Sequence, residues 1–316
     1  MKKVTVIIPN YNGHAYLEHC LSALYKHSEI DLEVLVVDNG SNDDSVENVR
    51  VKFPQVKVLQ LEKNYGFSRA VNEGIKAAKT PYVFLLNNDT QIQRHCVENL
   101  LKCIETSGDI FSVEAKLLQY HQPDKIDSAG TFYHVLGWAF ARGKGSDASR
   151  YSHRCDCFAA CAGAAMYRRE LLLKLGLFDE SFFAYLEDID LGYRAKLHGY
   201  RNVYEPTARV YHVGSGTSGS KYNEFKVRLS ARNNMYLVRK NMPIWQRLVN
   251  MPFLLLGCTI KALFFARKGL GKAYIIGLSE GIFSKKKWEH SEKNISRKTY
   301  GKIQWELWKN LGKKRW

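Results

Sequence analysis

Three polar sites in this sequence, two clusters and one histidine, have side-chain types and positions suited to chemistry. The first is Asn87, Asn88 and Asp89, which directly follow the apolar run "YVFLL". The second is the acidic cluster in "YLEDIDLGYR", and the third is the histidine in "VYHVGSG". Carboxylates and imidazoles can hold a metal ion or move a proton, and they can also have structural roles. Which use applies depends on the elements that position them.

The N-terminal third alternates β-rich runs with helical patterns. The runs are 4–8, 32–37, 56–61 and 82–86. A helical stripe of Leu17, Leu21 and Leu24 lies between the first two, and helical signals follow each later run. This alternation predicts an α/β fold with a doubly wound, mostly parallel sheet.

A polar segment follows each predicted strand. In chain order the segments are "PNYNG", "DNGSNDD", "KNYGF" and "NNDT". Ligands of open parallel sheets bind at the carboxyl ends of the strands, so we expect the four segments to converge on one crevice.

Two nucleotide-binding motifs are missing from this crevice. The first strand-to-helix turn, "IPNYNGHAYL", has one glycine where a dinucleotide fold requires G-x-G-x-x-G, and no G-x-x-x-x-G-K-[ST] occurs. A dehydrogenase and a P-loop enzyme are therefore disfavoured.

Six segments in family order resemble glycosyltransferase family 2, the inverting GT-A sugar transferases. They are "VTVIIPNYNG", "VVDNGSNDDS", "NYGFSRAVNEGI", "LLNNDT", "GLFDESFFAYLEDIDLGYR" and "VYHVGSG". Within the family they are most similar to bacterial rhamnosyltransferase-like members that build cell-surface polysaccharide. The resemblance covers about residues 4–215. It implies a GT-A domain over 1–220, with a nucleotide-sugar half at about 1–110 and an acceptor half at about 111–220.

The resemblance implies a divalent metal, Mn²⁺ or Mg²⁺. Asp89 stands at the last position of the family's D-x-D motif, where a carboxylate holds the ion against the donor diphosphate. Asn87 replaces the first Asp and is a weaker, neutral ligand. His212 stands where family members often use a histidine as a further ligand. The alternatives are that residues 87–89 cap a helix beginning "TQIQRHCVENLL" and that His212 is structural.

Asp188 matches the family's E-D motif, in which the Asp is the general base. Inversion requires a carboxylate that takes the proton of the acceptor hydroxyl. The alternative is that Glu187, Asp188 and Asp190 occupy the first turn of a helix and are favoured there by its dipole. Asp190 and Arg194, at i and i+4, are expected to form a structural pair.

The resemblance also assigns donor-binding residues, which are Pro9, Tyr11, Asp38, Asn64, Gly66, Arg69 and Asn88. Asp38 would accept from the pyrimidine ring N–H, which uracil and thymine have and cytosine lacks. Arg69 can reach the diphosphate or be a solvated helix residue. Every residue assigned to the donor lies at or before His212, so a deletion beyond about Gly214 is expected to leave the crevice in place.

Charge is distributed unevenly along the 316 residues. Residues 221–316 hold 22 of the 47 Lys and Arg but only 5 of the 31 Asp and Glu, a net of +17, whereas the first 220 have a net of −1.

The apolar run Leu248 to Ile260 has 13 uncharged residues, too few to span a bilayer. We therefore expect 221–316 to be a basic helical extension that lies on an anionic membrane surface, strengthened by "SKKKW", "KNISRK" and "IQWELWKNLGKKRW". The alternatives are core packing and, without any recognised module, nucleic-acid binding, which we do not expect.

The compartment is expected to be the cytoplasm. The first apolar run, Val4 to Ile8, is too short for a signal peptide. The seven cysteines suit reducing conditions. Cys155, Cys157 and Cys161 lack a second pair at zinc-site spacing, so we expect ordinary thiols there rather than a metal site.

Together these features predict an inverting glycosyltransferase peripheral to the inner face of the cytoplasmic membrane. Its donor would be dTDP-rhamnose or, next, a UDP-sugar, and its acceptor a glycan or lipid-linked glycan. Two alternatives stay open: a non-catalytic sugar-nucleotide-binding or scaffold protein, and a sugar nucleotidyltransferase.

Overall fold

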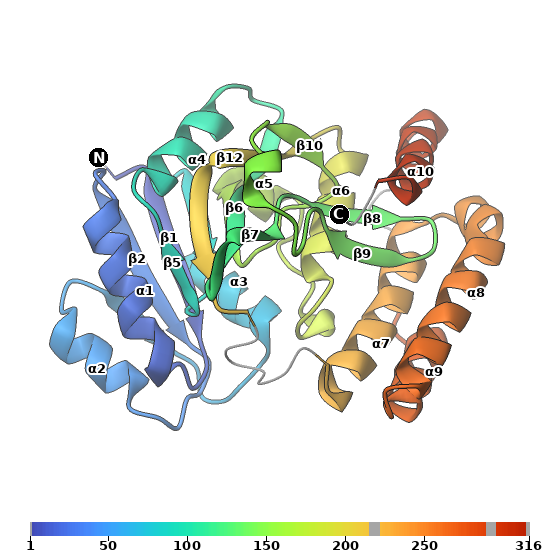
Figure 1. The fold of residues 1–316 in the computed structure, drawn as a ribbon, viewed down its shortest axis with the longest axis horizontal. Helices are drawn as coiled ribbons and strands as arrows, with labels where there is room; N and C mark the ends of the chain where they lie inside the picture. The colour runs from blue at the N-terminus through green and yellow to red at the C-terminus, as the bar shows by residue number, and fades with distance from the viewer. Residues whose placement is uncertain (1, 215–221, 289–294, 314–316) are drawn as a thin grey trace.

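A computed structural model describes residues 2–214, 222–288 and 295–313. Figure 1 shows an α/β body with a group of C-terminal helices at one end. The first half of the central sheet is parallel, in the order β4-β1-β2-β3. Its strands are β1 (Val4–Asn10), β2 (Leu32–Asp38), β3 (Lys57–Gln60) and β4 (Tyr82–Leu86). All four agree with the predicted runs to within a few residues.

The second half of the sheet is mixed. β6 and β12 pair in parallel, and β11 lies antiparallel between β4 and β6. Further antiparallel strands join β6 and β12 at the edges, and β8 and β9 form a separate hairpin. The bounds are β5 (Thr90–Ile92), β6 (Ile110–Gln119), β7 (Gln122–Ser128), β8 (Thr131–His134), β9 (Trp138–Ala141), β10 (Cys155–Cys157), β11 (Ala164–Arg168) and β12 (Arg201–His212).

Helices cover both faces of the sheet. One face packs against α1 (His14–His27), α2 (Ser45–Lys52) and α4 (Cys96–Glu105), and the other against α3 (Phe67–Ala77), α5 (Arg169–Lys174) and α6 (Glu187–Leu197). Short 3₁₀ turns, η1 (Ala148–Arg150) and η2 (Glu180–Phe182), lie in the connections. Alternate residues of β1 enter the two cores: Val6 and Ile8 face one, Ile7 the other.

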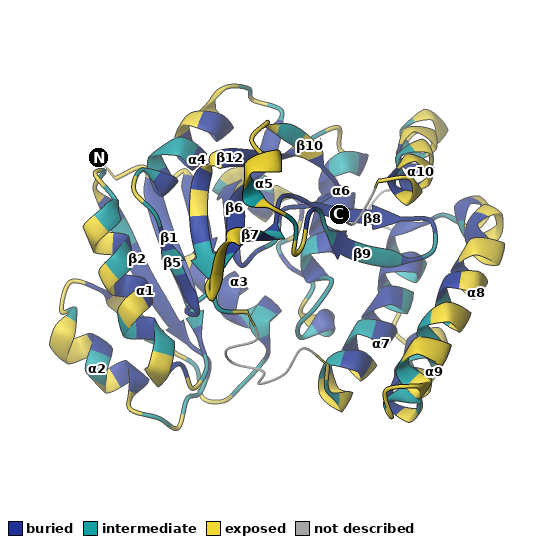
Figure 2. Cartoon of the chain, viewed as in Figure 1, coloured by how far each residue is buried: buried dark blue, intermediate teal, exposed yellow. Residues whose placement is uncertain are grey.

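The C-terminal helices are α7 (Glu224–Asn241), α8 (Ile244–Ala266), α9 (Gly271–Ile282) and α10 (Arg297–Leu311). α9 packs closely on α7 at Gly281, which has no side chain to prevent it: a Cβ added there would lie only 2.6 Å from the carbonyl oxygen of Arg232. α10 lies against β8, where Asn310 donates to the carbonyl of Tyr133. Figure 2 shows that α8 and α9 are largely exposed along their outer sides. Part of "KNISRK" and the last residues of "IQWELWKNLGKKRW" lie outside the described residues.

One sequence-based alternative and one expectation are wrong. No helix begins at Thr90, because residues 90–92 form β5 and α4 starts at Cys96, so residues 87–89 are not a helix cap. α8 is also longer than expected: within the described residues it is one helix long and apolar enough, by length and composition, to cross a membrane. Lys261 lies within α8 and does not end it, and its ammonium group is 5.5 Å from the centre of the Trp138 ring.

Candidate active site

A cavity of about 790 Å³ lies at the carboxyl ends of the parallel strands. All four polar segments that follow β1 to β4 contribute to its lining, so the predicted convergence is confirmed. The predicted site residues that line it are Pro9, Tyr11, Asn64, Gly66, Asn87, Asn88, Asp89, Asp188 and His212. Asp38 and Arg69 do not line it.

Asp38 lies behind the cavity wall. One of its oxygens accepts from Asn10 Nδ2 at 3.0 Å and from Ser41 Oγ at 2.6 Å. Asn10 in turn accepts from Asn88 Nδ2 at 2.8 Å. Asp38 therefore holds the amides that face the cavity, and its contact with a nucleobase stays a prediction.

Arg69 lies over an aromatic ring. Its guanidinium carbon is 4.3 Å from the centre of the Tyr65 ring, and its Nε is buried without a hydrogen-bond partner among the described residues. The ring contact is a cation–π interaction that orients the side chain. A contact with the donor diphosphate stays a prediction.

The pairing of β5 with β12 brings Asp89 and His212 together. His212 is the register partner of Thr90, the residue after Asp89. As a result His212 Nε2 lies 3.4 Å from Asp89 Oδ1, and both side chains are largely buried at the cavity wall. The family resemblance assigned both residues to one metal site, and the strand pairing brings their side chains together.

Sequence reasoning missed two further cavity residues, Asp127 and Lys144. Asp127 Oδ2 lies 2.8 Å from His212 Nδ1, and Lys144 donates to Asp127 Oδ1 at 2.6 Å. Asp127 belongs to no recognised motif, and Lys144 lies in a Gly- and Ser-rich stretch typical of a loop. No local pattern could have found them.

The electrostatics around Asp89, His212 and Asp127 favour positive charge. Burial alone would lower the pKa of His212, but hydrogen bonds to Asp127 and Asp89 and the charges of both carboxylates raise it to about 9. Burial likewise opposes ionisation of Asp127, yet the hydrogen bond to His212 and the charge of Lys144 lower its pKa. The position between the two carboxylates is thus suited to a cation.

Asp188 lies in the first turn of α6 and lines the same cavity. Its Oδ1 accepts from the backbone N–H of Ile189 at 2.8 Å. Burial raises the pKa of Asp188 and of neighbouring Glu187, because desolvation disfavours both carboxylates. A carboxylate with a raised pKa in a cavity is suited to accept a proton near neutral pH.

Asp190 is structural, as predicted. It is fully buried and accepts from Arg194 at 2.7 Å, from Lys240 at 3.0 Å and from Asn241 at 2.8 Å. Burial opposes its ionisation, but Arg194 and Lys240 lower its pKa. Lys240 also pairs with Asp179, so the network joins α6 to α7.

The C-terminal extension forms part of the cavity wall. The contributing residues, all from the start of α7 and just before it, are Asn223, Phe225, Lys226 and Ser230. The cavity as a whole therefore extends beyond Gly214, and the effect of a deletion there on the donor crevice stays a prediction. The cavity extends this far because α7 folds back against η2 and the start of α6 rather than extending away from the body.

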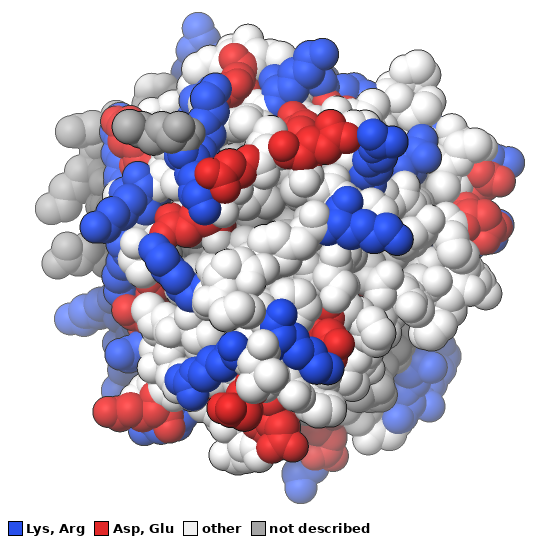
Figure 3. Space-filling view, turned by 90° about the vertical axis from the view of Figure 1, so that its left-hand side faces the viewer, with Lys and Arg blue, Asp and Glu red and all other residues white. Residues whose placement is uncertain are grey.

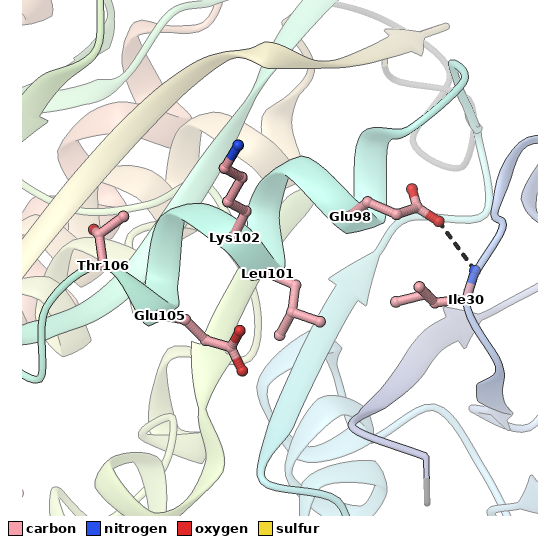
Figure 4. Close-up of a pocket in the computed structure, with 6 residues that line it drawn as sticks. All are labelled: Ile30, Glu98, Leu101, Lys102, Glu105 and Thr106. Atoms are coloured by element: carbon pink, nitrogen blue, oxygen red, sulfur yellow. Dashed lines mark hydrogen bonds between the residues drawn. The ribbon is translucent and has the colours of Figure 1, made fainter.

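Other features of the body do not compete with this site. Among the described residues, this site included, no group of three or more His, Cys, Asp and Glu is placed to hold a metal ion, and all seven cysteines are free thiols. A shallower pocket on α4 is lined by Ile30, Glu98, Leu101, Lys102, Glu105 and Thr106 (Figure 4). In it Glu98 accepts from the backbone N–H of Ile30, which anchors a loop, and no predicted site residue is present.

Comparisons with known proteins identify the family and the fold. The profile of the family described as "Glycosyl transferase family 2" matches residues 5–176. The N-acetylglucosaminyl-diphospho-decaprenol L-rhamnosyltransferase of Mycobacterium tuberculosis is 27% identical over 244 residues, 68% of this chain and 77% of the relative.

Two solved structures share the GT-A fold. GalNAc-T7, crystallised with UDP, GalNAc and Mn²⁺, superposes with a TM-score of 0.62 at 18% identity, over 76% of this chain and 48% of its own. The mannosyltransferase PcManGT from Pyrobaculum calidifontis, in complex with GDP-Man and Mn²⁺, gives 0.58 at 16% identity, over 90% and 88%. Because the family profile spans more than half of its residues, this chain belongs to glycosyl transferase family 2 and is a glycosyltransferase.

Proposed function

We propose that this enzyme transfers a sugar, with inversion, from a nucleoside-diphosphate sugar to a lipid-linked glycan. The observation that carries the proposal is that Asp188 and the Asp89–His212 pair line one cavity. A proton acceptor and a cation-binding pair on the same cavity supply the two functions that an inverting transfer requires.

Asp188 is the proposed general base. It would take the proton of the acceptor hydroxyl as that oxygen attacks the anomeric carbon of the donor, and the nucleoside diphosphate leaves from the opposite side. Burial makes Asp188 a stronger base, because its raised pKa means that the carboxylate binds a proton more tightly near neutral pH.

Asp89 and His212 are the proposed protein ligands of a divalent cation, with Asn87 as a weaker neighbour. Their ligand atoms are 3.4 Å apart, close to the ~3 Å that separates adjacent ligands of an ion with bonds of ~2.1 Å. Asp127 Oδ2 lies 2.8 Å from His212 Nδ1, which leaves Nε2 facing Asp89. The raised pKa of His212 keeps a proton on Nε2, and this proton would have to be displaced before the lone pair could act as a ligand. When bound, the cation would neutralise charge on the departing diphosphate.

The donor is proposed to be dTDP-rhamnose first and a UDP-sugar next. The mycobacterial relative is named as an L-rhamnosyltransferase, and GalNAc-T7 was crystallised with UDP. Pro9, Tyr11, Asn64, Gly66 and Asn88 are the proposed contacts, with Asp38 and Arg69 as less direct ones.

The enzyme is proposed to lie on the inner face of the cytoplasmic membrane, where the lipid-linked acceptor would be present. α8 exposes large apolar side chains, including Leu248, Leu255 and Leu263, and α10 exposes Trp305 and Trp308. The opposite side of α8 contacts protein, since Trp138 donates to the carbonyl of Gly257 and Asn250 pairs with Gln304. A helix engaged on one side by protein suits an in-plane position better than a transmembrane one.

Charge supports the same orientation. Figure 3 shows acidic and basic side chains intermixed on the face at the end of the molecule that holds α1 and α2. The net +17 belongs to residues 221–316, which also carry the exposed apolar residues. Lys and Arg beside an apolar face favour an anionic lipid surface.

A donor panel tests the proposal. Purified full-length protein is incubated with dTDP-, UDP- and GDP-sugars, Mn²⁺ and a polyprenyl-diphosphate glycan, and the released nucleotide is identified. Release of a nucleoside diphosphate with one donor is expected. Release of pyrophosphate would instead indicate a nucleotidyltransferase, and no turnover with any donor would contradict the proposed substrates.

A further inference from the structure

The segment that leads into Asp188 has an unusual backbone. Phe183, Tyr185 and Leu186 have φ angles of 64°, 70° and 70°. At Phe183 ψ is −61°, and the N–H of Ala184 donates to the carbonyl of Phe182 at 2.7 Å, which is a γ-turn of the rare, strained kind. Such conformations of non-glycine residues persist only where the surroundings hold them.

One side chain from α7 holds this segment. Asn233 Nδ2 lies 2.9 Å from the carbonyl oxygen of Phe182 and 2.8 Å from those of Ala184 and Tyr185. An amide nitrogen has two hydrogens, so one N–H is shared between two of these oxygens. Asn233 is fully buried, and without it the carbonyl groups of Ala184 and Tyr185 would lose this side-chain donor.

The neighbouring Arg232 reinforces this contact. Its Nε donates to Asn233 Oδ1 at 3.0 Å, which fixes the orientation of the amide. Its Nη2 donates to the carbonyls of Ser181 at 3.2 Å and Phe182 at 3.0 Å. On the far side of α7, Arg239 donates to the carbonyls of Gly281 and Ser284, so the helix is itself anchored on α9.

The same segment lies between the donor side and the proposed base. The carbonyl of Phe183 accepts from the backbone N–H of Ser68 at 3.2 Å, and a Cβ added at Gly66 would lie 2.6 Å from the Phe183 ring. At its other end Leu186 directly precedes α6, whose first turn bears Asp188. The backbone that Asn233 holds therefore sets the start of α6 and the direction of the Asp188 side chain.

We propose that Asn233 is a positioning residue for transfer. It fastens residues 182–186 in their strained conformation and so aims the Asp188 carboxylate at the acceptor hydroxyl. The inference rests on the proposed function, because it takes Asp188 to be the general base. It also assigns to the C-terminal extension a part in catalysis that is separate from membrane binding.

The test compares Asn233→Asp with Asn234→Asp. The first keeps the size and the acceptor oxygen but removes both N–H donors. The second places the same buried carboxylate one residue further along α7, where Asn234 Oδ1 accepts from Tyr133 Oη and, within the described part of the chain, no hydrogen bond to a carbonyl of residues 182–186 is present. We expect kcat to fall about 10- to 100-fold in Asn233→Asp and to change little in Asn234→Asp, because misplaced catalytic groups cost rate rather than binding.

Two binding and dynamics measurements complete the test. The affinity for UDP or dTDP with Mn²⁺, measured by calorimetry, should change little in either variant. Amide hydrogen exchange over residues 182–190 should become faster in Asn233→Asp alone, and this readout requires no turnover. If Asn233→Asp does not fold, Asn233→Ser and its control Asn234→Ser are measured instead.

The outcomes separate this inference from the proposed function. Equal losses of kcat in both variants, or unchanged exchange at residues 182–190, would overturn the role of Asn233. A lack of turnover by the unsubstituted protein would count against the proposed function, and the exchange comparison would still decide whether Asn233 holds the segment.

Discussion

His212 Nδ1 and Asp127 Oδ2 lie 2.8 Å apart, although the two residues belong to different strands, β12 and β7. The contact fixes the orientation of the imidazole ring and directs Nε2 toward Asp89. Carboxylate–histidine pairs of this kind hold ligating histidines at metal sites. Asp127 is therefore expected to affect metal binding without itself touching the ion.

Substitution of Asp127 tests this relationship. In Asp127→Asn the Mn²⁺ concentration that gives half-maximal activity should rise about 10- to 100-fold, because the ring loses its charged hydrogen-bond partner. A metal titration of nucleoside-diphosphate release measures the change. The control is Asp124→Asn, which changes an exposed residue paired with Lys125, and a titration curve for Asp127→Asn identical to that of the unsubstituted protein would contradict the assignment.

EDTA should abolish nucleoside-diphosphate release by the unsubstituted protein, and Mn²⁺ should restore it at least as well as Mg²⁺.

Asp188→Asn should abolish transfer while leaving donor binding intact. The amide fills the same space and cannot take a proton, so the rate is expected to fall by about 10²- to 10⁴-fold. Turnover with a verified acceptor and calorimetric binding of the nucleoside diphosphate are measured side by side. Near wild-type turnover would remove Asp188 from the role of base.

Activity should rise with pH through neutrality. Burial raises the pKa of Asp188 to about 7, so the carboxyl group is protonated and inactive as a base below that pH and ionised above it. Glu187 lies beside it and its pKa is raised as well, so the midpoint belongs to the pair. The pH dependence of kcat/KM between about pH 5.5 and 8.5 checks this, at saturating Mn²⁺. A flat profile, or a rate that falls with increasing pH, would be inconsistent with a carboxylate base.

The apolar side of α8 should provide salt-resistant membrane binding. We expect the full chain to co-sediment with anionic vesicles, to be released only in part by high salt, and to need detergent for complete extraction. Leu255→Gln with Leu263→Gln should remove the salt-resistant part, since each buried leucine contributes about 1.5–3 kcal/mol. Both side chains are exposed, so the melting temperature should change little.

A control for the vesicle experiment is available at the other end of the molecule. Val51 on α2 is 70% exposed and far in sequence from the extension, so Val51→Gln should leave vesicle binding unchanged. If the unsubstituted protein stays in solution beside anionic vesicles at low salt, the extension does not bind membranes. In that case its apolar surface must serve another contact.

The sequence alone predicted the parallel half of the sheet and the place of the site. Helices cover both faces of the strands at 4–8, 32–37 and 82–86, so almost every residue in these runs is apolar. The composition of each run therefore identifies the strand without knowledge of the rest of the chain. Polar segments at their carboxyl ends predicted one crevice, because parallel strands must end at the same edge. The Asp190–Arg194 pair was equally predictable, since helix geometry alone joins residues four apart.

Tertiary structure decided how the site is completed. Asp89 meets His212 only because β5 pairs with β12, and Asp127 reaches the ring only because β7 pairs with β6. The fold of α7 against the start of α6 places Asn233 on a strained turn, which no helical pattern in α7 reveals. These contacts join residues far apart in the chain, and strand register and helix packing specify them through the whole core. A local pattern records which face of an element is apolar, but it does not record which distant side chain that element will meet.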